Sequence, residues 1–214
     1  MTKKTETEKP PPAVMVVEEK GGVAAEMQMD AGTEIMKAEG QGEIQAAVVL
    51  AKRFPRDEER AKAKILAACD KEEFASVAYY SFPRGKKRSE DGEWVPNIVS
   101  GASIRLAREA KRNWHNVRSG FFITHDDDES RGIVAWAWDL EANNRESASD
   151  FFKKLIQRKT PDGQTMWVTA DERELRELTF RRASIIERNC LLTLFPSYEI
   201  DQWVETCKRT SAGG

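Results

Sequence analysis

The sequence predicts an α+β fold in which an antiparallel β-hairpin and a three-stranded β-meander pack with helices. Runs of β-branched and aromatic residues follow one another across short turns rich in Gly, Asp and Lys, which favours antiparallel pairing. A helix with separate apolar and basic faces lies between these runs. A long apolar-periodic segment near the end of the chain predicts a second, longer helix.

The first 43 residues differ in composition from the rest of the chain. They contain the run Pro10–Pro12, paired glycines and scattered glutamates, with little periodicity. Such a segment buries too little apolar surface to order itself. We therefore expect a flexible, disordered tail over residues 1–43, one domain over residues 44–208 and a flexible C-terminus over residues 209–214.

Capping residues and prolines set the expected element boundaries. Asp57 after Pro55 marks a helix start, Asp171 caps the long helix and Pro196 ends it. The expected segments are helices at 44–54 and 57–69, a helical turn at 71–75, a hairpin with strands at 77–82 and 94–99, a helix at 103–114, strands at 117–124, 132–141 and 147–158, and helices at 171–192 and 198–208.

Composition narrows the possible functions. The net charge is -2, yet the first 50 residues carry 5 Lys/Arg and 9 Asp/Glu, so the remainder has 29 basic and 27 acidic residues. Binding to nucleic acid would therefore depend on local basic patches rather than on overall charge.

The spacing of the cysteines and the hydropathy of the chain are those expected of a protein in the reducing cytoplasm. Cys69, Cys190 and Cys207 form no CxxC or Cys/His cluster, which predicts neither structural zinc nor a disulfide framework. No apolar run approaches the length of a membrane span, and the N-terminus lacks a signal-peptide pattern. We expect a cytoplasmic protein that does not contact a membrane.

Catalytic motifs are scarce. The chain has two histidines and no GxSxG, HExxH or phosphate-binding glycine loop. The acidic run Asp126–Glu129 beside His125 could hold Mg²⁺ in a nuclease. Consecutive acids at a hairpin turn more often form a solvated loop. We therefore expect a solvated turn at 126–129 and no enzymatic activity. We also expect that no cofactor is required, and Mg²⁺ is the only cofactor that this pattern suggests.

The helix at 103–114 carries the clearest basic stripe. Arg105, Arg108 and Arg112, with Lys111 beside them, lie opposite an apolar arc that contains Leu106 and Trp114. Three guanidiniums along one face can follow a phosphate backbone, although such stripes also serve solubility.

Other basic groups lie on the expected strands. Lys153, Lys154 and Arg158 fall on the third strand of the meander, and the tip of the first hairpin holds a basic loop at 84–88. Trp136 and Trp138 share one strand face with apolar neighbours, so we expect them in the core rather than as platforms for bases.

The long helix places an arginine in its apolar arc. Its expected buried residues are Leu175, Leu178, Ile185, Ile186 and Leu192, and Arg182 falls among them. A buried arginine needs a partner. The partner is either an acid such as Glu174 or a phosphate in a groove, while Arg181 and Arg188 share an exposed face.

The order of these elements resembles phage single-strand annealing proteins of the RecT/Redβ superfamily. The resemblance covers about residues 45–207 and rests on SIRLAREA at 103–110, LTFRRASIIERNCLLTLFP at 178–196 and IDQWVE at 200–205. It implies an RecT/Redβ-like annealing core in which Arg181, Arg182 and Arg188, and more loosely Arg105, Arg108 and Arg112, contact DNA.

The same resemblance implies an activity. Such proteins assemble into rings or filaments and anneal complementary DNA strands during phage recombination in the bacterial cytoplasm without ATP. The implied partners are single-stranded DNA, the annealed duplex intermediate, further copies of the chain, a phage exonuclease and a host single-strand binding protein. Two alternatives remain, a metal-dependent nuclease and a phage scaffold or regulatory protein that binds only protein.

Overall fold

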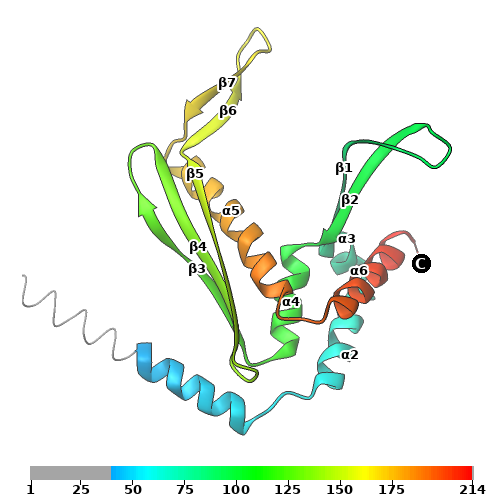
Figure 1. The fold of residues 1–214 in the computed structure, drawn as a ribbon, viewed down its shortest axis with the longest axis vertical. Coiled ribbons are helices and arrows are strands. Elements are labelled where there is room, and N and C mark those ends of the chain that lie inside the picture. The colour runs from blue at the N-terminus through cyan, green and yellow to red at the C-terminus, as the bar shows by residue number, and fades with distance from the viewer. Residues whose placement is uncertain (1–39, 214) are drawn as a thin grey trace, which may run out of the picture. The chain divides into compact units, whose positions relative to one another are not determined.

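The computed structural model describes residues 40–213, which contain six helices and seven strands in an α+β arrangement with antiparallel sheets. Residues 46–214 form one compact unit, and residues 1–45 belong to another, of which 40–45 are described. After a helix at 40–53, the elements are α2 (Glu58–Cys69), α3 (Glu72–Ala78), β1 (Tyr79–Arg88), β2 (Trp94–Ala102), α4 (Ile104–Trp114), β3 (Val117–Asp126), β4 (Ser130–Asp139), β5 (Asn144–Lys153), β6 (Leu155–Lys159), β7 (Thr165–Thr169), α5 (Glu172–Leu192) and α6 (Ser197–Ser211) (Figure 1).

Three helix starts have side-chain caps, and two of them, Asp57 and Asp171, were expected from the sequence. The side chains of Asp57 and Ser103 accept hydrogen bonds from the first-turn amides of α2 and α4. Asp171 and Glu174 form a reciprocal capping box at the start of α5. These side chains satisfy amides that have no partner within the helix, and they fix where each helix begins.

The two ends of the expected domain differ from the prediction. The first helix begins at residue 40 rather than 44, so residues 40–43 are not part of a disordered tail. The rest of the expected tail, residues 1–39, lies outside the described residues. At the other end, α6 continues to Ser211, which corrects the expected flexible C-terminus at residues 209–211.

Helices α2, α3, α4 and α6 enclose the larger core. Ile65, Leu106 and Trp203 are fully buried there, and Phe195 packs edge-on against Trp203 and Trp114. Strands β1 and β2 leave this core as an antiparallel hairpin, with a register shift between Pro83 and Lys86. The hairpin extends away from the helices (Figure 1).

The three-stranded sheet β3–β4–β5 is the expected meander, and α5 packs on one of its faces. The central strand turns Ile133, Ala135 and Ala137 toward α5, and all three are fully buried. The thiol of Cys190 on α5 approaches the carbonyl oxygen of Ala135 at 3.6 Å. The small alanine side chains allow this close approach of helix to strand.

The expected third strand at 147–158 is two strands in two different sheets. β5 ends at Lys153, and β6 pairs with β7 in a separate hairpin that was not expected. Lys154 stands at the division, where its amide donates to the Glu129 carbonyl and its own carbonyl accepts from Ala170. The helices therefore accompany three antiparallel sheets rather than one.

None of the helices within residues 40–213 is both long enough and apolar enough to cross a membrane.

Candidate nucleic-acid interface

Helix α5 links the sheet to the rest of the unit and lies near both hairpins. The β6–β7 hairpin directly precedes its first turn, and its last turns pack near α4 (Figure 1). On the β1 side, the guanidinium carbon of Arg188 lies 5.1 Å from the centre of the Tyr80 ring. A strand bound along the exposed side of α5 would therefore have a hairpin at either end.

The buried side of α5 differs from the expected arc. Its buried residues are Leu178, Thr179, Ala183, Glu187, Cys190 and Leu191. Ile185 is 47% exposed, and Leu175, Ile186 and Leu192 are only partly buried, so the arc is rotated from the one predicted. The rotation follows from a polar residue, since Glu187 lies inside the interface with α4 and β3.

Arg182 has an acidic partner, but not the one named from the sequence. Its Nη1 lies 3.1 Å from Asp150 Oδ2 on β5, and its guanidinium lies 5.0 Å from the centre of the Phe152 ring. The Arg182 side chain is 41% exposed and therefore not a buried charge. Glu174 instead pairs with Arg158 at 2.8 Å.

An open cavity of about 460 Å³ lies beside this pair. Arg181 and Arg182 line it together with Asp150, Ile185 and Ile186. Arg181 also lines a second cavity nearer the start of α5, together with Glu174 and Glu177. Among the described residues, these acids pair with Arg158 and Arg173, and Arg181 itself forms no ion pair.

Arg188 continues this basic surface about two helical turns further on, seven residues after Arg181. Its Nε and Nη2 donate to the Asn189 side-chain oxygen at 3.2 and 3.0 Å, while the guanidinium packs over Tyr80. No acid among the described residues pairs with it. Arg181, Arg182 and Arg188 form what we call the α5 basic strip.

The α4 stripe is largely occupied by internal partners. Arg108 pairs with Glu187, and Arg112 pairs with Glu109. Lys111 donates to the Ser119 hydroxyl at 2.7 Å, and burial lowers the pKa of its ammonium. The apolar arc of α4 is buried as predicted. Of the stripe, only Arg105 is exposed without an acidic partner in the described part of the chain.

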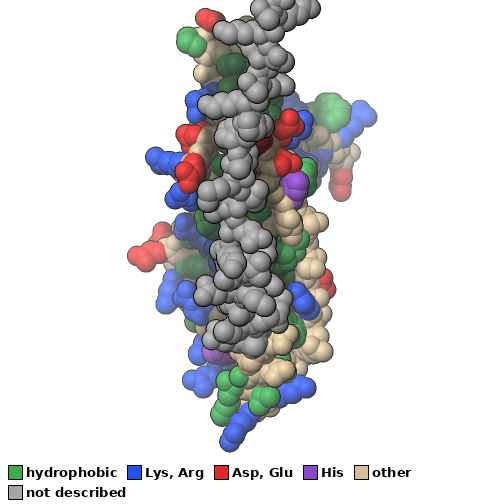
Figure 2. Space-filling view, turned by 90° about the vertical axis from the view of Figure 1, so that its left-hand side faces the viewer, with side chains coloured by type: hydrophobic (Ala, Val, Ile, Leu, Met, Phe, Trp, Pro, Cys, Tyr) green, Lys and Arg blue, Asp and Glu red, His purple; other side chains and the backbone are tan. Residues whose placement is uncertain are grey.

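The basic residues expected on one strand do not form a run. Lys153 is exposed at the end of β5, Lys154 pairs with Asp126 at 2.7 Å, and Arg158 lies in the other hairpin beside Glu174. In Figure 2, Lys and Arg side chains are scattered between acidic ones over the surface that is not hidden.

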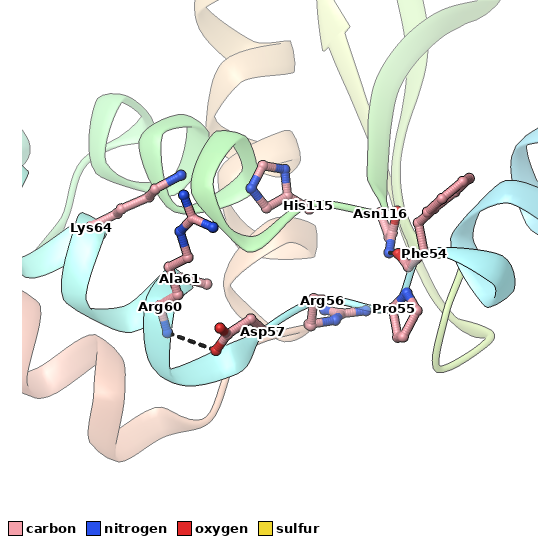
Figure 3. Close-up of a pocket in the computed structure, with 9 residues that line it drawn as sticks. All are labelled: Phe54, Pro55, Arg56, Asp57, Arg60, Ala61, Lys64, His115 and Asn116. Carbon is pink, nitrogen blue, oxygen red and sulfur yellow. Dashed lines mark hydrogen bonds between the residues drawn. The ribbon is translucent and has the colours of Figure 1, made fainter.

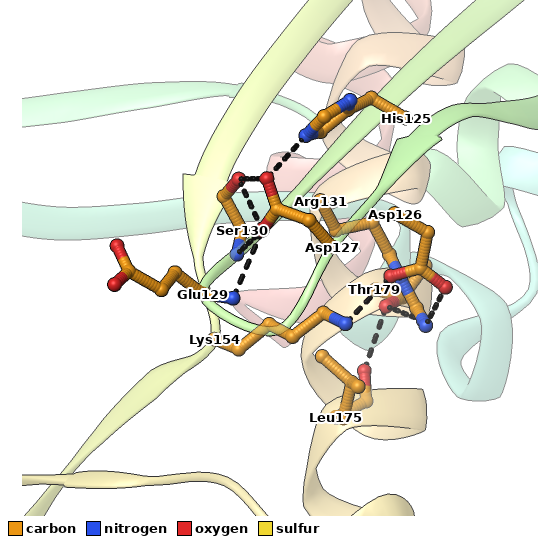
Figure 4. Close-up of polar contacts among 9 residues, drawn as sticks. All are labelled: His125, Asp126, Asp127, Glu129, Ser130, Arg131, Lys154, Leu175 and Thr179. Carbon is orange, nitrogen blue, oxygen red and sulfur yellow. Dashed lines mark hydrogen bonds and ion pairs between the residues drawn. The ribbon is translucent and has the colours of Figure 1, made fainter.

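The acidic turn forms a closed network of ion pairs and hydrogen bonds (Figure 4). Asp126 bonds Arg131 and Lys154, which lowers the pKa of Asp126 to about 2. Asp127 accepts from Ser130 and lies 2.6 Å from His125 Nε2, and these bonds lower its pKa as well. Within residues 40–213, no group of three or more His, Cys, Asp or Glu is placed to hold a metal ion.

A further basic cavity was missed from the sequence. It has a volume of about 460 Å³, and Arg60, Lys64 and His115 extend toward it from α2 and the end of α4 (Figure 3). His115 has a φ of 62°, in the left-handed region. The i, i+4 spacing of Arg60 and Lys64 was a visible signal, but His115 joins them only through the fold.

No family model, curated protein or solved structure matches this chain.

Proposed function

We propose that this protein binds single-stranded DNA and anneals it to a complementary strand without ATP, as an oligomeric recombinase of the RecT/Redβ type. The observation that supports this most strongly is the α5 basic strip. Two of its three arginines form no ion pair in the described chain, and the third, which is 41% exposed, pairs with Asp150. The strip is an anion-binding surface with unused capacity.

The spacing of the strip suits an extended polyanion. Arg181 and Arg188 are seven residues apart, which places them on one helix face about 10 Å apart along the axis. Arg182 lines the cavity beside β5 together with Arg181. A phosphate in this cavity would replace Asp150 as the partner of Arg182, since both present oxygen acceptors to the same guanidinium.

Annealing follows from neutralisation of phosphate charge. Two strands repel each other, and arginines along the groove reduce that repulsion while the bases remain available for pairing. Base pairing and stacking then supply the free energy, so the protein needs no nucleotide cofactor. Further copies of the chain, side by side, would extend the surface along a strand.

The two alternatives have less support in the geometry. A nuclease at the acidic turn would have to use Asp126 and Asp127, whose carboxylates are already bonded to Arg131, Lys154, His125 and Ser130. A protein-binding scaffold would give no reason for arginines without acidic partners along α5.

The experiment is a strand-annealing assay with two complementary fluorescently labelled oligonucleotides, in the absence of ATP. We expect the full chain to accelerate annealing, with a steep decrease as the salt concentration rises. Unchanged annealing rates and no binding to single or paired strands would support the scaffold alternative. Cleavage of the strands in Mg²⁺ that is lost in Asp126→Asn would support the nuclease.

A further inference from the structure

The sheet β3–β4–β5 has a second face, opposite α5, with an unusual composition. Because side chains alternate along a strand, the residues between Ile133, Ala135 and Ala137 point away from the helix. We call this second face the open face. It corrects the expectation that Trp136 and Trp138 belong to the core, since both are on it and only half-buried.

Aromatic rings occur along the whole length of the open face. The register places Phe122 beside Val134, and Phe151 beside Gly132, on the two sides of the central strand. Phe122 is 50% exposed and Phe151 is 64% exposed. Trp136 and Trp138 continue the series on β4 itself. One aromatic ring therefore lies at every second position of β4 from Gly132 to Trp138, at intervals of about 7 Å along the strand.

Small residues beside these rings keep their faces accessible. Gly120 is the β3 partner of Trp136, and a Cβ at Gly120 would lie only 3.4 Å from the Trp136 ring. The indole therefore lies over the strand backbone. On the other side, Ser147 and Ser149 are the β5 partners of Trp136 and Val134. At the far end of the face the His125 ring packs beside Phe151, with ring centres 5.5 Å apart, and Phe151 remains 64% exposed.

Charge is distributed unequally between the two faces. The acids inside the three paired strands, Asp126, Asp139, Glu146 and Asp150, all lie on the side that faces α5. The strand positions of the open face carry Arg118, Arg145 and Lys153, and no Asp or Glu. The nearest acid at its end, Asp127, is already bonded to His125 and Ser130.

We propose that the open face binds the unpaired bases of a single strand of nucleic acid by stacking on Phe122, Trp136 and Phe151. This proposal rests on the proposed function and deepens it by adding a base-contacting surface to the phosphate-contacting α5 basic strip. Bases stack on aromatic rings whatever their sequence, as annealing of any strand requires. Arg145 and Lys153 on the open face complement phosphate, whereas a second copy of the same face would bring like charges together.

The test compares two probes of equal length, an oligo-dT strand and a strand of abasic sites that has phosphates but no bases. The variant Phe122→Leu/Phe151→Leu removes two rings while keeping apolar side chains, and Phe122→Tyr/Phe151→Tyr is the control that keeps the rings. Both positions are exposed, so folding should be retained, which a thermal melt verifies. Binding is measured by fluorescence anisotropy with the full chain.

We expect the leucine variant to bind oligo-dT roughly 10-fold more weakly and the abasic strand as the wild type does. The tyrosine variant should bind both probes normally. Unchanged affinity of the leucine variant for oligo-dT, or an equal loss for both probes, would overturn the stacking proposal. A change of molecular mass by light scattering with DNA binding intact would instead identify the open face as an interface between copies.

The same titrations separate the two proposals. If Arg181→Gln/Arg188→Gln weakens binding of both probes while the leucine variant does not differ from wild type, the proposed function stands and the stacking proposal fails. If the wild type binds neither probe, both fail.

Discussion

The guanidinium Nη2 of Arg108 lies 2.6 Å from Glu187 Oε2 and joins α4 to α5. The other carboxylate oxygen of Glu187 accepts a hydrogen bond from Ser119 at 2.8 Å, and the Ser119 hydroxyl accepts one from Lys111. The Glu187 side chain is 7% exposed, so it is a nearly buried carboxylate at the centre of three elements. Arg108 and Lys111 are thereby anchored to the fold, while the Arg108 side chain remains 53% exposed.

Replacing this carboxylate should destabilise the fold. Glu187→Leu leaves Lys111 and Ser119 without their anion, and we expect the free energy of unfolding to fall by roughly 2–4 kcal/mol. Urea denaturation measures this. Glu205→Gln is the matched control, because Glu205 is 69% exposed in its pair with Lys208 and its loss should cost less than about 1 kcal/mol. Equal losses in the two variants would contradict the assigned role of Glu187.

The acidic turn should make stability depend on pH. The pKa of Asp126 is lowered to about 2 by its bonds with Arg131 and Lys154. A lowered carboxyl pKa stabilises the folded state above the ordinary aspartate value of about 4, and this contribution is lost as pH falls toward 2. We expect wild type to exceed Asp126→Asn in stability at pH 6, with the difference shrinking between pH 4 and pH 2.

Denaturation of both proteins at several pH values measures that difference. The effect should be small, since the Asp126 side chain is 42% exposed. A difference that stays constant from pH 6 down to pH 2 would show that Asp126 contributes through something other than its charge.

The sequence predicted the elements well wherever the signal is local. Asp57 and Asp171 were recognisable as helix caps, and each forms its capping bond. The apolar arc of α4 was visible from its period alone because its residues all face one core.

Long-range pairing was not predictable in the same way. The chain leaves the meander at Lys154, whose ion pair with Asp126 and backbone bonds to Glu129 and Ala170 depend on distant segments. Nothing local in the run at 147–158 marks that break, so one strand was expected where two occur.

The orientation of α5 and the faces of β4 show a further limit. Glu187 is buried because Arg108 and Ser119 meet it from other elements, and a hydrophobic period cannot indicate a buried acid. On β4, the large tryptophans suggested the core face, yet α5 packs on the alanine side, where small residues let it come close. Among the candidate site residues, the partner of Arg158 was equally invisible, because Glu174 lies on α5, whereas Arg112 pairs with Glu109 at a local i,i+3 spacing.

Removing the acid of the Arg182–Asp150 pair should strengthen DNA binding, whereas removing arginines from α5 should weaken it. In Asp150→Asn, Arg182 loses its acidic partner and becomes available to phosphate, so we expect tighter binding of single-stranded DNA and a salt dependence steeper by about 0.7. Stability should change by less than about 1 kcal/mol, because both side chains are partly exposed. Anisotropy titrations at several salt concentrations measure this. Weaker binding in Asp150→Asn would exclude Arg182 from the DNA-contacting surface.

The annealing rate of Arg181→Gln/Arg188→Gln tests the central claim most directly. The matched control is Arg173→Gln/Arg176→Gln, which removes the same charge from the same helix at two exposed arginines that pair with Glu177 and Glu172. We expect the first variant to anneal complementary oligonucleotides at least about 10-fold more slowly, with a shallower salt dependence, and the control to remain close to wild type. Equal rates in wild type and both variants would contradict an annealing surface on α5.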